Sequence, residues 1–168
     1  KTEIKIGATA GPHAEVVEAV AKEAKKQGLN IKVVEFSDYI TPDKALANGD
    51  IDLNSYQHAP FLQNFNKQNN ETLVPIGKTI LMRMGVYSDK VHDIKDLASG
   101  ATVAIPNDPT NGGRGLVLLE KAGLIKLKDG VGLLPTSLDI VENPKNLKIV
   151  ELEAPQLPRS LDDAQIAL

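Results

Sequence analysis

The sequence predicts an α/β fold made of two α/β units, and three observations support this prediction. Over the first eighty residues, short apolar and β-branched runs alternate with segments of helical periodicity, as in proteins whose helices pack on a parallel sheet. A second alternation of the same kind begins near Tyr87. The run Lys78–Tyr87 between them lacks a flexible Ser/Gly-rich composition, which favours interlobe strands over a loose linker. One continuous doubly wound domain is the alternative.

Residues 1–80 are predicted to form the first unit, with three strand–helix pairs. Over Ala14–Gln27, apolar residues recur at helical spacing, and Gly28 ends this helix. Thr41 is expected to be an N-cap, because Pro42 follows it at the position that proline favours in a first helical turn. The same criteria predict strands over 4–9, 30–36 and 51–54, helices over 42–48 and 59–68, and an extended apolar run over 73–84.

Residues 81–87 are predicted to form a hinge crossing, and residues 88–168 a second unit. A short helix is expected to start around Asp93 and to end at Gly100. The remaining predicted elements are strands over 102–105 and 147–152, helices over 112–122 and 137–142, a loop over 123–132, an irregular or briefly helical stretch over 155–163 and an incipient strand over 164–168.

The composition excludes several classes of function. The formal net charge is −3 with acidic and basic residues interspersed, which argues against a nucleic-acid-binding surface. The chain has no cysteine, and no apolar run approaches the length needed to span a membrane. His13, His58 and His92 lack metal-ligand spacing, and no Gly-x-Ser-x-Gly motif is present. We therefore expect no metal, no cofactor and a binding function, not an enzymatic one.

The segment Thr102–Gly115 predicts an anion site. A polar, Gly/Pro-rich turn joins a strand to a helix, and Arg114 is expected in the first turn of that helix. A helix N-terminus favours anions, and a guanidinium group suits a carboxylate or phosphate. The three glycines around Arg114 would let the backbone approach a ligand closely. An ordinary capping turn with a solvated arginine is the alternative.

Aromatic and imidazole rings follow two of the predicted strands. Tyr56, His58 and Phe61 lie within six positions after the third strand, and Tyr39 follows the second. Because parallel strands end at the same edge of a sheet, these rings are expected to line a pocket for a small ligand. Structural roles are the alternative, since a lone histidine is usually a hydrogen-bond partner and core packing explains Phe61 equally well.

Several long stretches of the chain resemble the methionine-binding lipoprotein family, the MetQ/NlpA type of substrate-binding protein for bacterial ABC importers. The similar stretches are Ser37–Pro42, Gly49–Phe61, Val103–Arg114, Gly123–Pro135 and Glu151–Asp162. The resemblance implies a two-lobed periplasmic-binding-protein fold of the Venus-flytrap type II class that closes on a free amino acid. L-Methionine is the implied ligand, with D-methionine or a methionine dipeptide as close variants. An ABC permease with its ATPase is the implied partner.

The resemblance also implies a role for individual residues. Arg114 would hold the ligand carboxylate with Asn111 beside it, and Tyr39, Tyr56, His58 and Phe61 would line the side-chain pocket. The aromatic identities at Tyr56 and Phe61 depart from those usual in the family, which would retune that pocket.

The family further implies a location in the periplasm or at the cell surface, with a lipid anchor on an upstream cysteine that this chain lacks. Because the family's chain runs past Leu168, the second lobe is expected to be incomplete on its C-terminal side. Two alternatives remain for the function. One is a surface lipoprotein with an adhesin or immunomodulatory role, and the other is an enzyme acting on a small carboxylate.

Overall fold

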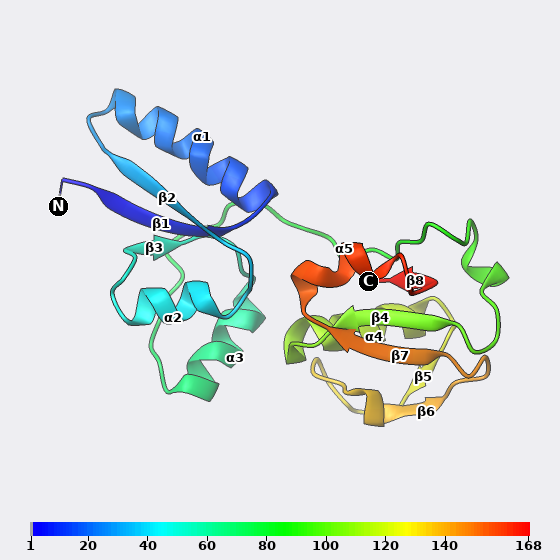
Figure 1. Cartoon of the computed structure of the whole chain (residues 1–168). Helices are drawn as coiled ribbons and strands as arrows, with labels where there is room; N and C mark the ends of the chain where they lie inside the picture. Colours follow the sequence, from blue (N-terminus) through cyan, green and yellow to red (C-terminus); the bar gives the residue numbers. More distant parts are fainter. Residues whose placement is uncertain (1) are drawn as a thin grey trace. The chain divides into compact units, whose positions relative to one another are not determined.

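The computed structural model describes residues 2–168, and the chain separates into two compact units (Figure 1). The first unit ends at Leu81, and the second spans Met82–Leu168. Each unit contains its own three-stranded sheet and its own buried apolar side chains. The predicted alternation of strands and helices is present in both, whereas the hinge role of residues 81–87 stays a prediction.

The first unit is a parallel sheet packed with three helices. Its elements are β1 (Ile4–Thr9), α1 (Pro12–Lys26), β2 (Ile31–Phe36), α2 (Thr41–Ala47), β3 (Leu53–Asn54) and α3 (Ala59–Asn69). The strand order is β2-β1-β3, and β1 runs parallel to both neighbours. Residues 37–40 and 55–58 therefore leave the sheet at the same edge, beyond the carboxyl ends of β2 and β3.

The core of this unit lies between β1 and α1. Ile6 and Ala8 of β1 pack with Ala14 and Val17 of α1, and all four are buried. Gly7 allows a second close approach, because a Cβ at this position would lie 2.7 Å from Cδ1 of Ile51. The central strand is thus apolar on both faces, as expected for a parallel sheet.

Helix α2 is capped differently from the prediction. Thr41 is the first residue of the helix, not its N-cap. The carboxylate of Asp38 accepts hydrogen bonds from the backbone N–H of Ile40 at 3.0 Å and of Thr41 at 2.7 Å, and from the Thr41 hydroxyl at 2.9 Å. An earlier acidic residue therefore satisfies the free N–H groups of the first turn.

The second unit contains a parallel sheet and a small antiparallel pair of strands. Its elements are η1 (Ile94–Asp96), β4 (Thr102–Pro106), α4 (Pro109–Lys121), β5 (Lys126–Leu127), η2 (Ser137–Asp139), β6 (Ile140–Glu142), β7 (Lys148–Leu152), η3 (Ala154–Gln156), α5 (Leu157–Ser160) and β8 (Ile166–Ala167). The parallel sheet has the order β7-β4-β8, and β5 pairs with β6.

Strand β4 forms the centre of the second core. Val103 and Ile105 have no exposed surface and pack with Leu116 and Leu119 of α4. Tyr87 extends the sheet, because its backbone exchanges hydrogen bonds of 2.9 and 3.0 Å with Ala167 in an antiparallel bridge. The predicted incipient strand at the end of the chain is thus β8, paired on both sides.

Three predicted elements of the second unit differ from the structure. The short helix expected from about Asp93 to Gly100 is a single 3₁₀ turn, η1, which ends at Asp96. Residues 137–142 do not form a helix: a single 3₁₀ turn ends at Asp139, and residues 140–142 form β6. The stretch 123–132, predicted to be a loop, contains strand β5, which pairs with β6. The β-branched pair Ile140 and Val141 favours a strand, but only tertiary pairing with residues far back in the chain decides it.

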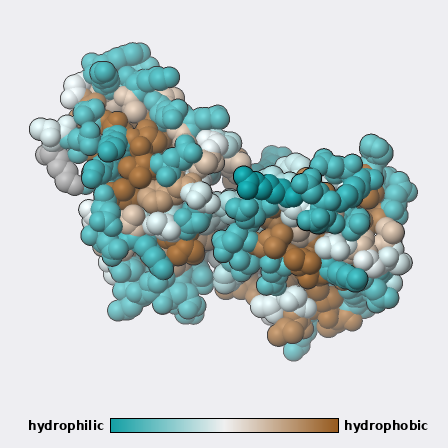
Figure 2. All heavy atoms as spheres, in the orientation of Figure 1, coloured by the Kyte–Doolittle hydropathy of each residue, from teal (hydrophilic) through white to brown (hydrophobic). Residues whose placement is uncertain are grey.

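Apolar side chains also reach the surface of both units. On the face shown in Figure 2, brown apolar atoms lie between teal hydrophilic ones in each unit. Exposed apolar side chains include Val20 and Leu29 in the first unit and Leu133 and Leu138 in the second. None of the helices within residues 2–168 is both long enough and apolar enough to cross a membrane.

Candidate ligand-binding site

The four predicted rings of the first unit lie together. The ring centroids of Tyr39, Tyr56 and Phe61 are 6.0–6.3 Å apart, and the His58 ring lies 6.4 Å from that of Phe61. Phe61 contacts both tyrosines edge to face, at interplanar angles of 84° and 74°. These distances are within the range of favourable aromatic pairs. We call these four residues the ring cluster.

Three segments of the first unit carry the ring cluster. Tyr39 follows β2, Tyr56 and His58 follow β3, and Phe61 lies in the first turn of α3. The hydroxyl of Tyr56 donates a 2.6 Å hydrogen bond to the backbone carbonyl of Tyr39, which ties the two loops together. Phe61 is only 6% exposed, so it also belongs to the core, whereas the other three rings are partly exposed.

A buried carboxylate lies next to the ring cluster and was missed by sequence reasoning. Asp43, in the first turn of α2, has no exposed surface. Its Oδ1 accepts hydrogen bonds from Nδ2 of Asn54 at 2.8 Å and from Nε2 of Gln57 at 2.6 Å. Burial raises the pKa of the Asp43 carboxyl above its ordinary value, although these hydrogen bonds oppose the effect.

In the second unit, Asn111 and Arg114 form the other predicted group. The Arg114 guanidinium donates a 3.0 Å hydrogen bond to Oδ1 of Asn111. Nδ2 of Asn111 in turn donates to Oδ1 of Asp108 at 3.2 Å. Asn111 is buried and Arg114 is exposed, so a fixed amide orients a charged group that solvent or a ligand can reach.

The predicted anion site at the start of this helix needs correction. Helix α4 begins at Pro109, three residues before the predicted start, so Arg114 lies in its second turn and not its first. The Asp108 carboxylate already caps the helix, accepting from the backbone N–H of Asn111 at 2.9 Å and from the Thr110 hydroxyl at 3.0 Å. A carboxylate of the chain itself therefore occupies the favourable position at this N-terminus, and an anion would have to bind through Arg114.

The glycines beside Arg114 serve packing. A Cβ on Gly112 would lie 2.8 Å from the carbonyl oxygen of Pro106, and one on Gly113 would lie 2.8 Å from that of Leu133. Both distances are too short for real Cβ contacts. The glycines let α4 lie directly on β4 and on the segment around Leu133, and the close approach of a ligand to them stays a prediction.

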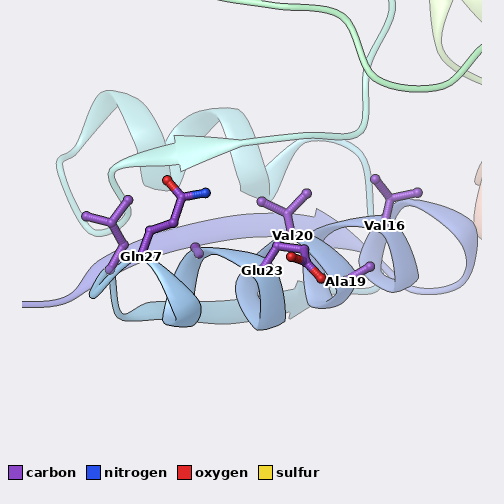
Figure 3. A pocket seen from close by; sticks show the side chains of 7 residues that line it. Val16, Ala19, Val20, Glu23 and Gln27 are labelled. Atoms are coloured by element: carbon purple, nitrogen blue, oxygen red, sulfur yellow. The ribbon is translucent and has the colours of Figure 1, made fainter.

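An open apolar groove of about 430 Å³ lies elsewhere in the first unit, on α1 (Figure 3). Its lining includes Val16, Val20 and Gln27 of the helix and Leu29 beyond it. It contains none of the six predicted site residues. The groove is therefore separate from the ring cluster.

The two groups of residues favour non-covalent binding. The ring cluster offers an apolar, polarisable surface, and Arg114 offers a positive charge with several donors. Within residues 2–168, no group of three or more His, Cys, Asp or Glu side chains is arranged to hold a metal ion.

Solved structures define the class to which this fold belongs, that of the substrate-binding proteins. The chain superimposes on a crystal structure of the methionine binding protein MetQ with a TM-score of 0.95 at 55% identity, covering 99% of this chain and 69% of that one. It superimposes on a nutrient binding protein from Burkholderia cenocepacia bound to methionine with a TM-score of 0.94 at 52% identity, covering 98% and 70%. The predicted two-lobed α/β fold class is thereby confirmed.

Residues 4–168 match the sequence model of the NlpA lipoprotein family, and the chain belongs to this family. It is 60% identical over 166 residues to the D-methionine-binding lipoprotein MetQ of Salmonella typhimurium. That match covers 98% of this chain but only 61% of the relative. The chain thus spans less than two thirds of the length of this relative.

Proposed function

We propose that this protein captures methionine outside the cytoplasm and passes it unchanged to an ABC importer. The observation that carries the proposal is the close match, over 98% of the chain, to a protein whose structure was solved with methionine bound. The name of the Salmonella relative supports the same ligand and extends it to D-methionine. A ring cluster and an oriented arginine in one chain are chemically suited to this ligand.

Each group of residues would bind a different part of methionine. The ring cluster, formed by Tyr39, Tyr56, His58 and Phe61, would hold the thioether, because sulfur packs favourably against ring edges. Arg114 would pair with the carboxylate through charge-assisted hydrogen bonds. Asn111 would keep the guanidinium in place.

The proposal also includes a location and partners. The family's lipoprotein names support an extracytoplasmic, lipid-anchored protein that delivers its ligand to a permease and its ATPase. No nucleic acid is involved, and no bond of the ligand is broken. Residues 81–87 are proposed as the hinge that bends when the protein binds its ligand.

A ligand screen tests the proposal. The purified protein, freed of bound ligand by unfolding and refolding, would be screened by thermal shift against the twenty amino acids, D-methionine and a Gly-Met dipeptide. We expect stabilisation by methionine or these close variants, because a ligand that binds only the folded state raises its melting temperature. Mass spectrometry of the incubated ligand checks that it remains intact.

Two outcomes would contradict the proposal. A protein that is folded but stabilised by none of these ligands would favour the surface adhesin alternative. Formation of a chemically altered product would favour an enzyme acting on a small carboxylate.

A further inference from the structure

We propose that Asp43 is a positioning residue: its buried carboxylate fixes the loop that carries Tyr56 and His58 and thereby sets the preference of the ring cluster for a methionine-type side chain. The part of this inference that concerns ligand preference rests on the proposed function. The part that concerns the placement of the rings does not.

The hydrogen bonds of Asp43 converge on one atom. Nδ2 of Asn54 and Nε2 of Gln57 both donate to Oδ1 of Asp43, at 2.8 and 2.6 Å. Nδ2 of Asn54 also approaches the backbone carbonyl of Pro42 at 3.2 Å. A single acceptor on α2 thus holds the residues at both ends of the segment 54–57, so that Tyr56 is fixed between them.

The same loop is held from its other side by the tyrosines. The Tyr56 hydroxyl donates to the backbone carbonyl of Tyr39, and Tyr39 lies within the turn that Asp38 caps. Asp43 therefore restrains Tyr56 through the residues on both sides of it and through the Tyr56 side chain itself, and the Tyr39 carbonyl fixes the hydroxyl. Loss of the first restraint would leave the ring held by its hydroxyl and by its contacts with the rings of Tyr39 and Phe61.

Packing alone does not require a carboxylate at this position. Removing a carboxylate completely from water disfavours its charged form, and an apolar side chain of similar size would fill the space without that cost. What an apolar side chain cannot supply is an acceptor for the two partly buried amide groups of Asn54 and Gln57. The carboxylate of Asp43 is thus best explained by its role in orienting the segment 54–57.

Near-ultraviolet circular dichroism tests the placement of the rings without any ligand. The chain has three tyrosines and no tryptophan, and two of the tyrosines belong to the ring cluster. The third, Tyr87, is 62% exposed. The tyrosine signal of the folded protein should therefore report mainly on Tyr39 and Tyr56, and Tyr87→Phe is the matched control that should leave most of it unchanged.

We expect Asp43→Leu to lose most of the near-ultraviolet tyrosine signal while its far-ultraviolet spectrum stays that of the folded protein. Asp43→Asn should keep the signal, because its amide oxygen can accept the same two hydrogen bonds. If Asp43→Leu does not fold, Gln57→Met removes one donor from a partly exposed position and should weaken the signal in the same direction. Full retention of the signal in a folded Asp43→Leu, or in Gln57→Met where Asp43→Leu does not fold, would overturn the proposal.

Calorimetry tests the preference for the ligand. The ratio of the alanine Kd to the methionine Kd should fall by about tenfold in Asp43→Leu and stay unchanged in Asp43→Asn. A purely structural role would lower the melting temperature and the active fraction but leave this ratio intact, which would contradict the proposal. If the unaltered protein binds no methionine, the proposed function fails, and the spectroscopic comparison still decides the role of Asp43.

Discussion

At the scale of single residues, two carboxyl groups on either side of the start of α2 experience opposite environments. Asp43 is fully buried, and burial raises its pKa. Burial would also raise the pKa of Asp38, but its hydrogen bonds with Thr41 and Ile40 outweigh this and lower it. One carboxyl group therefore makes folding less favourable when it ionises, and the other makes it more favourable.

Asp43→Asn should increase the stability of the protein more at neutral than at acid pH. Because the folded-state pKa of Asp43 is raised, its contribution to stability is fully present below the ordinary value of 3.8 and is lost as the pH rises through the folded pKa. The gain should be about 1.4 kcal/mol for each pH unit between the ordinary and the raised pKa. Urea unfolding of both proteins over a series of pH values measures it.

Asp38→Asn is the matched control, with the opposite sign. The lowered pKa of Asp38 contributes stability that is present above about 3.8 and is lost as the pH falls through the folded pKa. This variant should be less stable than the unaltered protein at neutral pH, and the difference should disappear in acid. If the stability of the two variants changed with pH in the same direction, the opposite pKa shifts of Asp43 and Asp38 would be contradicted.

Tyr56→Ala should weaken methionine binding more than alanine binding, because only the longer side chain reaches the ring cluster. A loss of roughly tenfold or more for methionine is expected from the removal of one aromatic contact surface. Tyr56→Phe keeps the ring and removes the hydroxyl, so it should retain most of the discrimination. Equal losses for both ligands on calorimetry would make Tyr56 a packing residue.

At the scale of elements, helix α4 is shaped by its three buried glycines. Gly113 faces the backbone of residues 133 and 134, where a Cβ would meet the Leu133 carbonyl oxygen at 2.8 Å. Gly115 faces Ile105. A Cβ added to Gly115 would lie 3.5 Å from the Cβ of Ile105, which is an ordinary contact distance. The two positions therefore differ in the space available and not in their helical conformation.

Gly113→Ala should destabilise the protein by about 1–3 kcal/mol, because the clash is with backbone that cannot move aside. Gly115→Ala should be neutral or stabilising by up to about 1 kcal/mol, since alanine favours the helix and the methyl group fits. The free energies of unfolding in urea compare the two. Equal stabilities would show that α4 is not held tightly against its neighbours.

The elements also show how far the sequence predicts this structure. The first unit could be predicted because β-branched runs and helical periodicity coincide with turn residues at nearly every boundary. The start of α4 was placed too late, since a Gly-Gly pair favours a loop unless close packing requires it within a helix. Strand β6 was missed because its pairing with Lys126 and Leu127 is a tertiary interaction.

The sequence predicts those parts of the candidate site that the order and direction of the strands bring together. Tyr39 and Tyr56 come together because β2 and β3 are parallel to β1 and end at one edge. Asp43 could not be found in this way. An acidic residue in a first helical turn is usually explained by the helix dipole and by exposure, and only the tertiary contacts with Asn54 and Gln57 show that it is buried.

At the scale of the whole molecule, the two units contribute different chemistry. The first supplies the ring cluster, and the second supplies Arg114, oriented by Asn111. In the proposed function, the first group holds the side chain of methionine and the second its carboxylate. The central claim is therefore that Arg114 recognises the carboxylate of methionine.

A thermodynamic cycle of methionine and methioninamide against the unaltered protein and Arg114→Met tests this claim most directly. Calorimetry should show that Arg114→Met weakens the binding of methionine by more than about a hundredfold, because the carboxylate is left as a buried unpaired charge. The binding of methioninamide, which has no carboxylate, should hardly change. The exposed Arg159→Met is the matched control and should bind methionine normally. Equal losses for the two ligands, or no methionine binding by the unaltered protein, would contradict the account.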